Sequence, residues 1–471
     1  MNANRFLGIT VMPEYIQTET AEGVLDRLAA AGVNAVTTSP YLMEEATEAE
    51  GSREPPADAG AGGVRLLDRP LWGKRELFVR TAPSFAPDPR LYRGLRYQPS
   101  PASELTRREG RVIHEFIRGA QARHMKVYLQ VQAAIPPGYR VQFGGPSEED
   151  RARLPDGRIP PRRLANNGSL ASPEIRRYTE ALLRDLLRVY PDVDGLRVDW
   201  PEYPPYFLDD VFLDFSPHAE AAAKRMGYDS AAMRRAAGAL YRKLHGGLTN
   251  ADLEAWTDPD GGRHNLLRAL ADEPSLAAWL RFKADLVANL LAGFRQAMNE
   301  AGGGTKELLP NAFPPPLTIA SGMDFARIAQ HVSGASVKLY TMHWPMMLRF
   351  WGDALREANP AVDPGRLVRA LVRWFDLADD AGFPRLEDYT YPGPETAHPV
   401  GAAAQARKIR QAQREASGRL PVYVLAHGYG PLADFRARLD VAWRSSGGRM
   451  WINRYAYLND AKLDAVREVT R

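Results

Sequence analysis

The sequence contains no cysteine. Disulfide bonds, a thiolate nucleophile and zinc or iron–sulfur sites with cysteine ligands are therefore excluded. No apolar run approaches the roughly 20 residues that span a bilayer, so we expect a soluble globular protein that has no membrane partner. The first residues run almost directly into a strand pattern and lack the regions of a signal peptide, which predicts a cytoplasmic protein.

Motifs that bind metals or nucleotides are missing as well. The nine histidines are dispersed, and none has the spacing of a zinc-binding motif, so we expect no metal ion. No Gly-x-Gly-x-x-Gly follows the first strand and no phosphate loop occurs, which predicts a protein without a cofactor. Gly-x-Ser-x-Gly, the nucleophile motif of a serine triad, is also absent.

Charge gives little support to nucleic-acid binding. The formal net charge is +4, and the basic residues are scattered among 57 acidic ones instead of forming a stripe. We therefore expect no nucleic-acid partner. The sequence does not indicate an oligomeric state.

Short apolar runs separated by amphipathic helical sequence predict the fold. The predicted strands lie at residues 6–12, 35–39, 126–134, 194–200, 308–313, 336–342, 421–427 and 449–455. Eight strand–helix units favour an α/β protein of the (β/α)8 TIM-barrel class, whose core takes about 250 residues. The alternative is an open doubly wound sheet, and the missing nucleotide motifs weigh against it.

The length beyond such a core predicts long loops within one domain that covers residues 1–471. Insertions are expected at residues 42–110 after the second strand, at 137–171 after the third, and at 205–304 after the fourth. The last of these has helical sequence. Because each insertion follows the carboxyl end of a strand, all should crowd the rim where barrel enzymes have their active sites.

Local signals mark the ends of two helices. Gly32 follows a helical pattern over residues 21–31 and is typical of a helix C-terminus. Ser172, Pro173 and Glu174 place an N-cap, a first-turn proline and a first-turn acid at the start of another helix. Both helices would lie between strands of the barrel.

The most informative stretch is Asp-Gly-Leu-Arg-Val-Asp-Trp-Pro-Glu-Tyr at the fourth predicted strand. In an extended chain, side chains alternate, so Arg197 and Asp199 share one face while Trp200 lies on the other. A charged pair on a buried strand indicates a polar site. Glu202 and Tyr203 follow just past the carboxyl end of the strand, where barrel enzymes do their chemistry.

This stretch, together with residues 211–219, Gly-Tyr-Asp at 227–229 and a closing strand at 451–458, resembles the uncharacterised glycosyl-hydrolase-like TIM-barrel proteins. More distantly, Gly-Leu-Arg-Val-Asp is similar to the Gly-Phe-Arg-x-Asp strand of the alpha-amylase clan. That resemblance implies that Asp199 is a nucleophile and that Arg197 orients it. The clan's fifth-strand glutamate is absent from residues 308–313, and its His-Asp pair is replaced by His-Gly at 427–428.

Glycoside hydrolysis needs a second carboxyl group. Glu202 is the first candidate for the acid because it follows the same strand, and Glu14 is the second because it follows the first strand. Asp324 and Asp210 rank lower, since each can be a helix-terminus or loop charge. We expect Arg197 to hold Asp199 ionised as nucleophile or base.

Polar and aromatic residues at other strand ends predict a sugar-binding cleft. The candidate substrate-binding residues are Arg197, Trp200, Tyr203, Gln130, Gln132, Asn311, His343, Trp344, His427, Asn453, Arg454 and Tyr455. The sequence therefore predicts a metal-independent glycoside hydrolase with a saccharide or glycoside substrate. Two alternatives stay open: a carbohydrate-binding barrel without activity, and a sugar lyase or isomerase.

Overall fold

Parallel strands close into a barrel in the computed structural model, which describes residues 5–56, 65–140, 142–258, 262–377 and 382–471. The strand order around the closed barrel is β1-β11-β10-β9-β8-β7-β6-β2. The strands are β1 (Phe6–Thr10), β2 (Ala35–Thr38), β6 (Lys126–Gln132), β7 (Gly195–Asp199), β8 (Glu307–Ala312), β9 (Ala335–Leu339), β10 (Val422–His427) and β11 (Arg449–Asn453). Each coincides with a predicted strand, so the (β/α)8 TIM-barrel prediction is confirmed.

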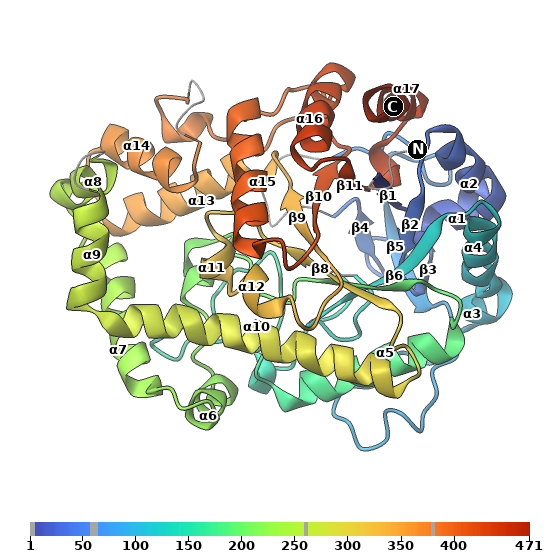
Figure 1. Ribbon diagram of the computed structural model, residues 1–471, viewed down its shortest axis with the longest axis horizontal. Helices are drawn as coiled ribbons and strands as arrows, with labels where there is room; N and C mark the ends of the chain where they lie inside the picture. The colour runs from blue at the N-terminus through green and yellow to red at the C-terminus, as the bar shows by residue number, and fades with distance from the viewer. Residues whose placement is uncertain (1–4, 57–64, 141, 259–261, 378–381) are drawn as a thin grey trace.

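Helices follow the barrel strands and surround them (Figure 1). They are α1 (Pro13–Glu19), α2 (Ala21–Ala30), α3 (Glu104–Glu109), α4 (Arg111–Ala122), α5 (Pro173–Val189), α11 (Thr318–Ser321), α12 (Phe325–Ile328), α13 (His343–Ala358), α14 (Pro364–Trp374), α15 (Ala402–Ala416), α16 (Leu432–Ser445) and α17 (Asp460–Thr470). Short 3-10 turns lie at Glu148–Asp150, Leu208–Phe212, Leu386–Asp388 and Tyr455–Tyr457.

The predicted helix signals act as expected. The Ser172 hydroxyl accepts the Ile175 N–H at the start of α5, and Pro173 occupies the first turn. Gly32 has φ of 77° just after α2, a conformation that favours glycine. Both predictions are confirmed.

Long segments extend from the barrel after β2, β6 and β7, and the one after β6 covers residues 133–172. β3 (Tyr41–Ala46), β4 (Ser52–Glu54) and β5 (Leu77–Pro83) follow β2 and pair in an antiparallel sheet of order β3-β5-β4. After β7 the chain forms α6 (Pro217–Arg225), α7 (Ser230–Leu244), α8 (Asn250–Thr257), α9 (Gly262–Asp272) and α10 (Pro274–Glu300). Residues 57–64, 141 and 259–261, within the predicted insertions, lie outside the described residues. The division into one domain with three insertions stays a prediction.

The long helix α10 runs beside α5 along one flank of the barrel (Figure 1). Its buried residues include Phe282, Leu290 and Phe294. Further out, α8 meets α14 through Trp256 and Trp374, whose ring centroids are 4.7 Å apart. None of the described helices is long and apolar enough to cross a membrane.

The floor of the barrel is apolar. Tyr128, Leu309, Leu425 and Trp451 form a buried cluster separate from the main core. A Cβ on Gly8 would lie 2.2 Å from the Trp451 ring, so the indole occupies the space above this glycine. The polar groups that project into the barrel therefore lie above this floor, toward the carboxyl ends of the strands.

Candidate active site

A cavity of about 340 Å3 opens at the carboxyl ends of the barrel strands. The predicted site residues that line it are Gln130, Gln132, Asp199, Trp200, Asn311, His343, His427, Asn453 and Arg454. They come from β6, β7, β8, β10, β11 and the loops that follow β7, β9 and β11. The structure thus brings side chains together that are more than 300 residues apart in sequence, such as Gln130 and Arg454.

Asp199 lies at the centre of this cavity, at the end of β7. Lys338 from β9 places its Nζ 2.5 Å from Asp199 Oδ1, and Asn311 Nδ2 donates to the same oxygen at 3.3 Å. The Asp199 side chain is 15% exposed, whereas that of Lys338 is 3% exposed. The carboxylate therefore has an open side toward the cavity, and the ammonium balances its charge from the buried side.

Arg197 lies one pleat deeper in the barrel and acts on Asp199 through Asn311. Its Nη2 donates to Asn311 Oδ1 at 2.8 Å, and its guanidinium lies 4.0 Å from the centroid of the Trp451 ring. Burial lowers the pKa of Arg197 to about 10. By holding the amide oxygen, Arg197 turns the amide nitrogen of Asn311 toward Asp199. The two charges share a face as predicted, but an amide connects them.

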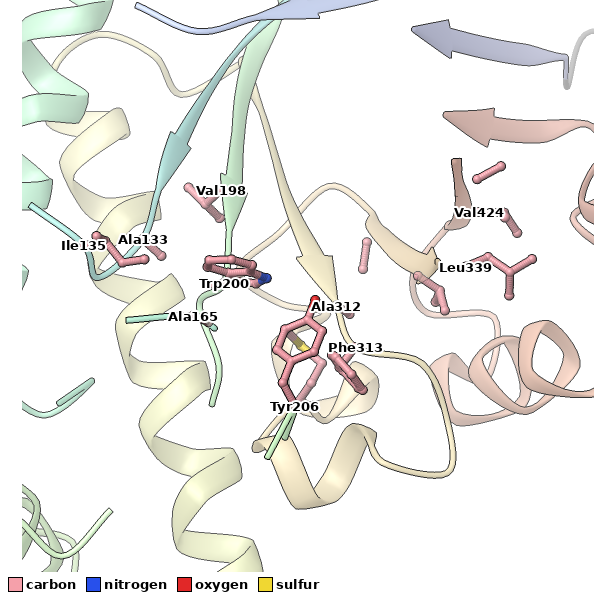
Figure 2. Packing of buried hydrophobic residues seen from close by; sticks show 14 of the residues in the cluster. Ala133, Ile135, Ala165, Val198, Trp200, Tyr206, Ala312, Phe313, Leu339 and Val424 are labelled. Carbon is pink, nitrogen blue, oxygen red and sulfur yellow. The ribbon is translucent and has the colours of Figure 1, made fainter. Parts of the chain in front are cut away.

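Trp200 does not continue the alternation of β7. The strand ends at Asp199, and Trp200 has φ of 52°, which turns its ring away from the position that an extended chain would give. Its ring lines the cavity 4.8 Å from Lys338 Nζ. Figure 2 shows Trp200 at the end of the strand, with Tyr206 and Phe313 nearby. Trp200 and Tyr206 give the cavity an apolar wall, and Phe313 packs against Tyr206 with ring centroids 5.3 Å apart.

Glu202 is fully buried behind this wall and does not line the cavity. Its carboxyl oxygens accept from the Phe313 N–H and meet the Ser321 hydroxyl, each at 2.6 Å. The same hydroxyl lies 2.6 Å from the Thr318 carbonyl oxygen. One hydroxyl proton cannot serve both oxygens, so the arrangement fits a protonated Glu202 that donates to Ser321. Burial, opposed by Lys338, raises the pKa of Glu202 to about 7.

Glu14 is also fully buried and lies in the first turn of α1. It accepts from the Tyr41 hydroxyl at 3.0 Å and from Arg140 at 3.1 Å. Burial raises the pKa of Glu14 although Arg140 opposes the shift. Arg140 also pairs with Glu54 at 2.7 Å, and it is Arg140 that lines the cavity. Glu14 therefore supports the wall from behind.

Several polar atoms in the cavity wall have no hydrogen-bond partner among the described residues. They include the side-chain oxygen of Gln132 and the indole nitrogen of Trp200. Buried polar groups are normally paired, so these atoms are available to a ligand with hydroxyl groups. Burial and the charges of Arg65 and Arg454 lower the pKa of His427 well below its ordinary value, which makes it a neutral donor or acceptor.

Other predicted site residues have structural contacts away from the cavity. The Tyr203 hydroxyl donates to Asp214 at 3.0 Å, and that of Tyr455 donates to Glu19 at 2.8 Å. Trp344 is buried in α13. The lower-ranked carboxylates also have such roles, since Asp210 pairs with Arg163 at 2.8 Å and Asp324 caps α12.

Sequence reasoning did not single out several residues of the cavity wall, which are Arg65, Arg140, Arg163, Tyr206, Lys338 and Tyr340. For Lys338 a signal was present. Ser336, Lys338 and Tyr340 alternate along the predicted sixth strand, and a lysine within a buried strand is the same indication that Arg197 gave. Arg65 and Arg140 come from long loops, where periodicity offers no such guide.

No protein-family model matches the chain, and no curated protein sequence matches it. Among solved structures it is similar to β-galactosidases from Marinomonas ef1 (11% identity, TM-score 0.49) and from Halorubrum lacusprofundi (13%, 0.48). It covers 59% and 57% of those two chains, which in turn match 98% and 99% of this one. The catalytic domain of β-amylase from Paenibacillus polymyxa is 9% identical over 98% of this chain and 97% of its own, with a TM-score of 0.49. At TM-scores below 0.5, these likenesses say nothing about the reaction of this chain.

In the ranges that the structure describes, no group of three or more histidine, aspartate or glutamate side chains is arranged to hold a metal ion. Among the described residues that line the cavity, Asp199 is the one carboxylate, and the Lys338 amine is in direct contact with it. This carboxylate and this amine are therefore the first candidates for the reacting groups of the cavity.

Proposed function

We propose that the chain is a glycoside hydrolase whose substrate binds in the cavity around Asp199. The observation that carries the proposal is the position of this carboxylate, which lies at a barrel strand end and is open to the cavity. Amides, histidines and aromatic rings around it are the groups that bind sugar hydroxyls and sugar ring faces.

Asp199 would act as nucleophile or base. Lys338 and Asn311 leave one side of its carboxylate toward the substrate, and both hold Oδ1 in a fixed position. A carboxylate fixed in this way loses little freedom when it attacks a sugar or orients a water molecule. Lys338 is the positioning residue with the shortest contact to it.

Glu202 remains the first candidate for the acid and Glu14 the second. A general acid must be protonated near neutral pH, and the raised pKa of Glu202, about 7, meets this requirement. Because Glu202 is fully buried and does not line the cavity, direct proton transfer to a substrate would require the side chains between them to move. Glu14 would need Arg140 to move from its position at the cavity.

The test is turnover of a glycoside panel by the wild-type protein and by Asp199→Asn. We expect the variant to lose several orders of magnitude in kcat with little change in binding, as when an essential carboxylate is removed. Glu202→Gln and Glu14→Gln, assayed on the same substrate, identify the acid. Near-normal turnover by Asp199→Asn would remove the role given to it, and binding without turnover in the wild type would favour a carbohydrate-binding barrel.

A second candidate function, a sugar lyase that forms an imine, is favoured by Lys338. Among the described residues that line the cavity, Asp199 is the sole carboxylate, and the Lys338 amine lies directly beside it. The amine could add to a sugar carbonyl and lose water while Asp199 takes up the proton. Sodium borohydride would reduce such an imine and add the sugar mass less one oxygen to Lys338. A panel of aldose and ketose sugars that leaves no adduct rules this candidate out.

A further inference from the structure

A second cavity adjoins the one around Asp199. Its volume is about 340 Å3, and its wall contains residues 159–163 together with Arg151. Arg163 and Asn166 line both cavities, so the two meet at these side chains. A ligand that occupies both cavities would contact these two side chains.

The wall of the first cavity has more cationic than anionic side chains, but most of its cations are balanced. Arg163 pairs with Asp210 at 2.8 Å, and Lys338 pairs with Asp199. Arg140 and Arg454 share one carboxylate, that of Glu54, at 2.7 Å and 3.0 Å. The excess of positive charge in the first cavity is therefore small, because short ion pairs neutralise most of its cations.

The second cavity differs because two of its three lining arginines, Arg151 and Arg162, lack such partners. Arg151 and Arg162 are exposed, and neither forms an ion pair with a described carboxylate. Arg162 lies over the Phe207 ring at 5.0 Å, which fixes its guanidinium without neutralising it. By contrast, Arg158 in the same loop pairs with Asp156 at 2.6 Å. Two uncompensated guanidiniums beside a cavity are suited to an oxyanion such as a carboxylate or a sulfate ester.

We infer that the substrate is an acidic oligosaccharide, with one sugar in the cavity around Asp199 and an anionic group of a neighbouring sugar in the second cavity. This inference rests on the proposed function for the identity of the ligand as a saccharide. Arg151 and Arg162 bind the anionic group, and Arg163 and Asn166 lie at the junction between the two sugars. The charge arrangement sets the substrate class: a short sugar chain that carries at least one carboxylate or sulfate.

The test is titration calorimetry with trigalacturonate, trimannuronate and a chondroitin sulfate tetrasaccharide. The neutral comparisons are the methyl ester of trigalacturonate and cellotriose. We expect at least one acidic oligosaccharide to bind about tenfold tighter than either neutral one, a difference that shrinks when the ionic strength rises from about 0.05 M to about 0.5 M. Which acidic ligand binds best distinguishes carboxylates from sulfates.

Variants locate the effect. Arg151→Gln and Arg162→Gln should each weaken the binding of the acidic oligosaccharide by roughly two- to fivefold, which is the size of effect that exposed charge pairs have. The binding of monomeric galacturonate should not change. Arg235→Gln is the matched control, because Arg235 is exposed on α7 and lines neither cavity. A single-stranded oligonucleotide serves as a polyanion of another class.

Three results would overturn the inference: neutral oligosaccharides that bind as tightly as acidic ones, an oligonucleotide that binds more tightly than both, or unchanged affinity in the two variants. Binding does not involve bond cleavage, so these results leave the proposed hydrolase activity untouched. Conversely, an Asp199→Asn protein with full turnover would remove the proposed mechanism and leave the charge preference in place.

Discussion

At the scale of single residues, the site depends on how each charge is compensated. Asp199 has Lys338 beside it and a free side toward the cavity, which suits a reacting group. Glu202 has neighbouring donors but no cation in direct contact, and its pKa rises to about 7 mainly through burial. The two carboxyl groups therefore differ in burial and in the charge beside them, and such differences in environment separate the acid from the base in an active site.

Glu202→Gln should change how stability depends on pH. The pKa of Glu202 is raised from 4.5 to about 7 in the folded protein, so the folded state keeps a proton that the unfolded state releases. The stabilisation is complete below about pH 4.5 and falls by about 3 kcal/mol as the pH rises to about 7. Glutamine keeps both hydrogen bonds without ionising, so the variant should lack this decline.

Urea unfolding of both proteins at about pH 5 and about pH 8 measures the effect. We expect similar stability at the lower pH and a more stable variant at the higher pH. Glu115→Gln, on the exposed side of α4, removes one carboxyl group without changing a buried contact and serves as control. Parallel pH dependence of the wild type and Glu202→Gln would contradict a protonated Glu202.

At the scale of strands and helices, the sequence was sufficient for the barrel but only partly for the site. Every barrel strand was predictable because short apolar runs that alternate with amphipathic helices form parallel strands joined by helical crossovers. The carboxylate at the end of β7 and the amides on β6 and β8 followed from the alternation of side chains. The bridge from Arg197 through Asn311 could not be predicted, because it joins residues 114 positions apart.

The same limit applies where a strand ends. Trp200 was expected on the far face of β7, and its φ of 52° instead turns it into the cavity. Neither sequence periodicity nor propensity predicts such a conformation for tryptophan. Arg140 and Arg65 reach the cavity from long loops, and their positions depend on pairing with Glu54 and on contacts with distant segments.

The close approach of Gly8 to Trp451 gives a prediction for β1. Gly8→Ala would place a methyl group 2.2 Å from the indole on the adjacent β11, so the ring and the barrel floor must shift. We expect a loss of about 2–3 kcal/mol in unfolding free energy, as in other overpacked cores. Displacement of Trp451 should also move the Arg197 guanidinium that lies over its ring. We therefore expect a higher KM or a lower kcat for any substrate that is found.

Gly23→Ala in α2 is the matched control. Its new Cβ would lie 3.4 Å from the nearest atom, an ordinary contact, and alanine is the better helix former. Chemical denaturation should show no loss for this variant. A Gly8→Ala protein as stable as Gly23→Ala would mean that Trp451 does not close the floor of the barrel tightly.

At the scale of the whole molecule, the long excursion after β7 has two parts with different attachment to the barrel. Helix α10 lies along α5 with one buried face (Figure 1). Its Lys283 is buried and donates to the carbonyl oxygens of Val211 and Ala320. Within the described residues of α8, Leu253 alone is buried. The sequence predicts helices here but not which of them the barrel holds.

Hydrogen exchange under native conditions should separate these two parts. Opening of α10 would expose Phe282, Leu290 and Phe294 and would break the contacts of Lys283. The amide hydrogens of α10 should therefore exchange at the same free energy of opening as those of β7. Opening of α8 removes the packing of Leu253, the Trp256–Trp374 contact and the ion pairs of Asp252 and Glu254 with Lys243 and Arg366. Partly exposed ion pairs contribute little, so we expect this opening at a free energy several kcal/mol lower. Equal protection of α8 and α10 would show instead that the excursion unfolds as one unit. If α10 opens independently of β7, the loop after β7 loses the contacts of Lys283 with Tyr203 and Val211 whenever α10 opens. Substrate binding should then weaken under the same mild denaturing conditions that release α10.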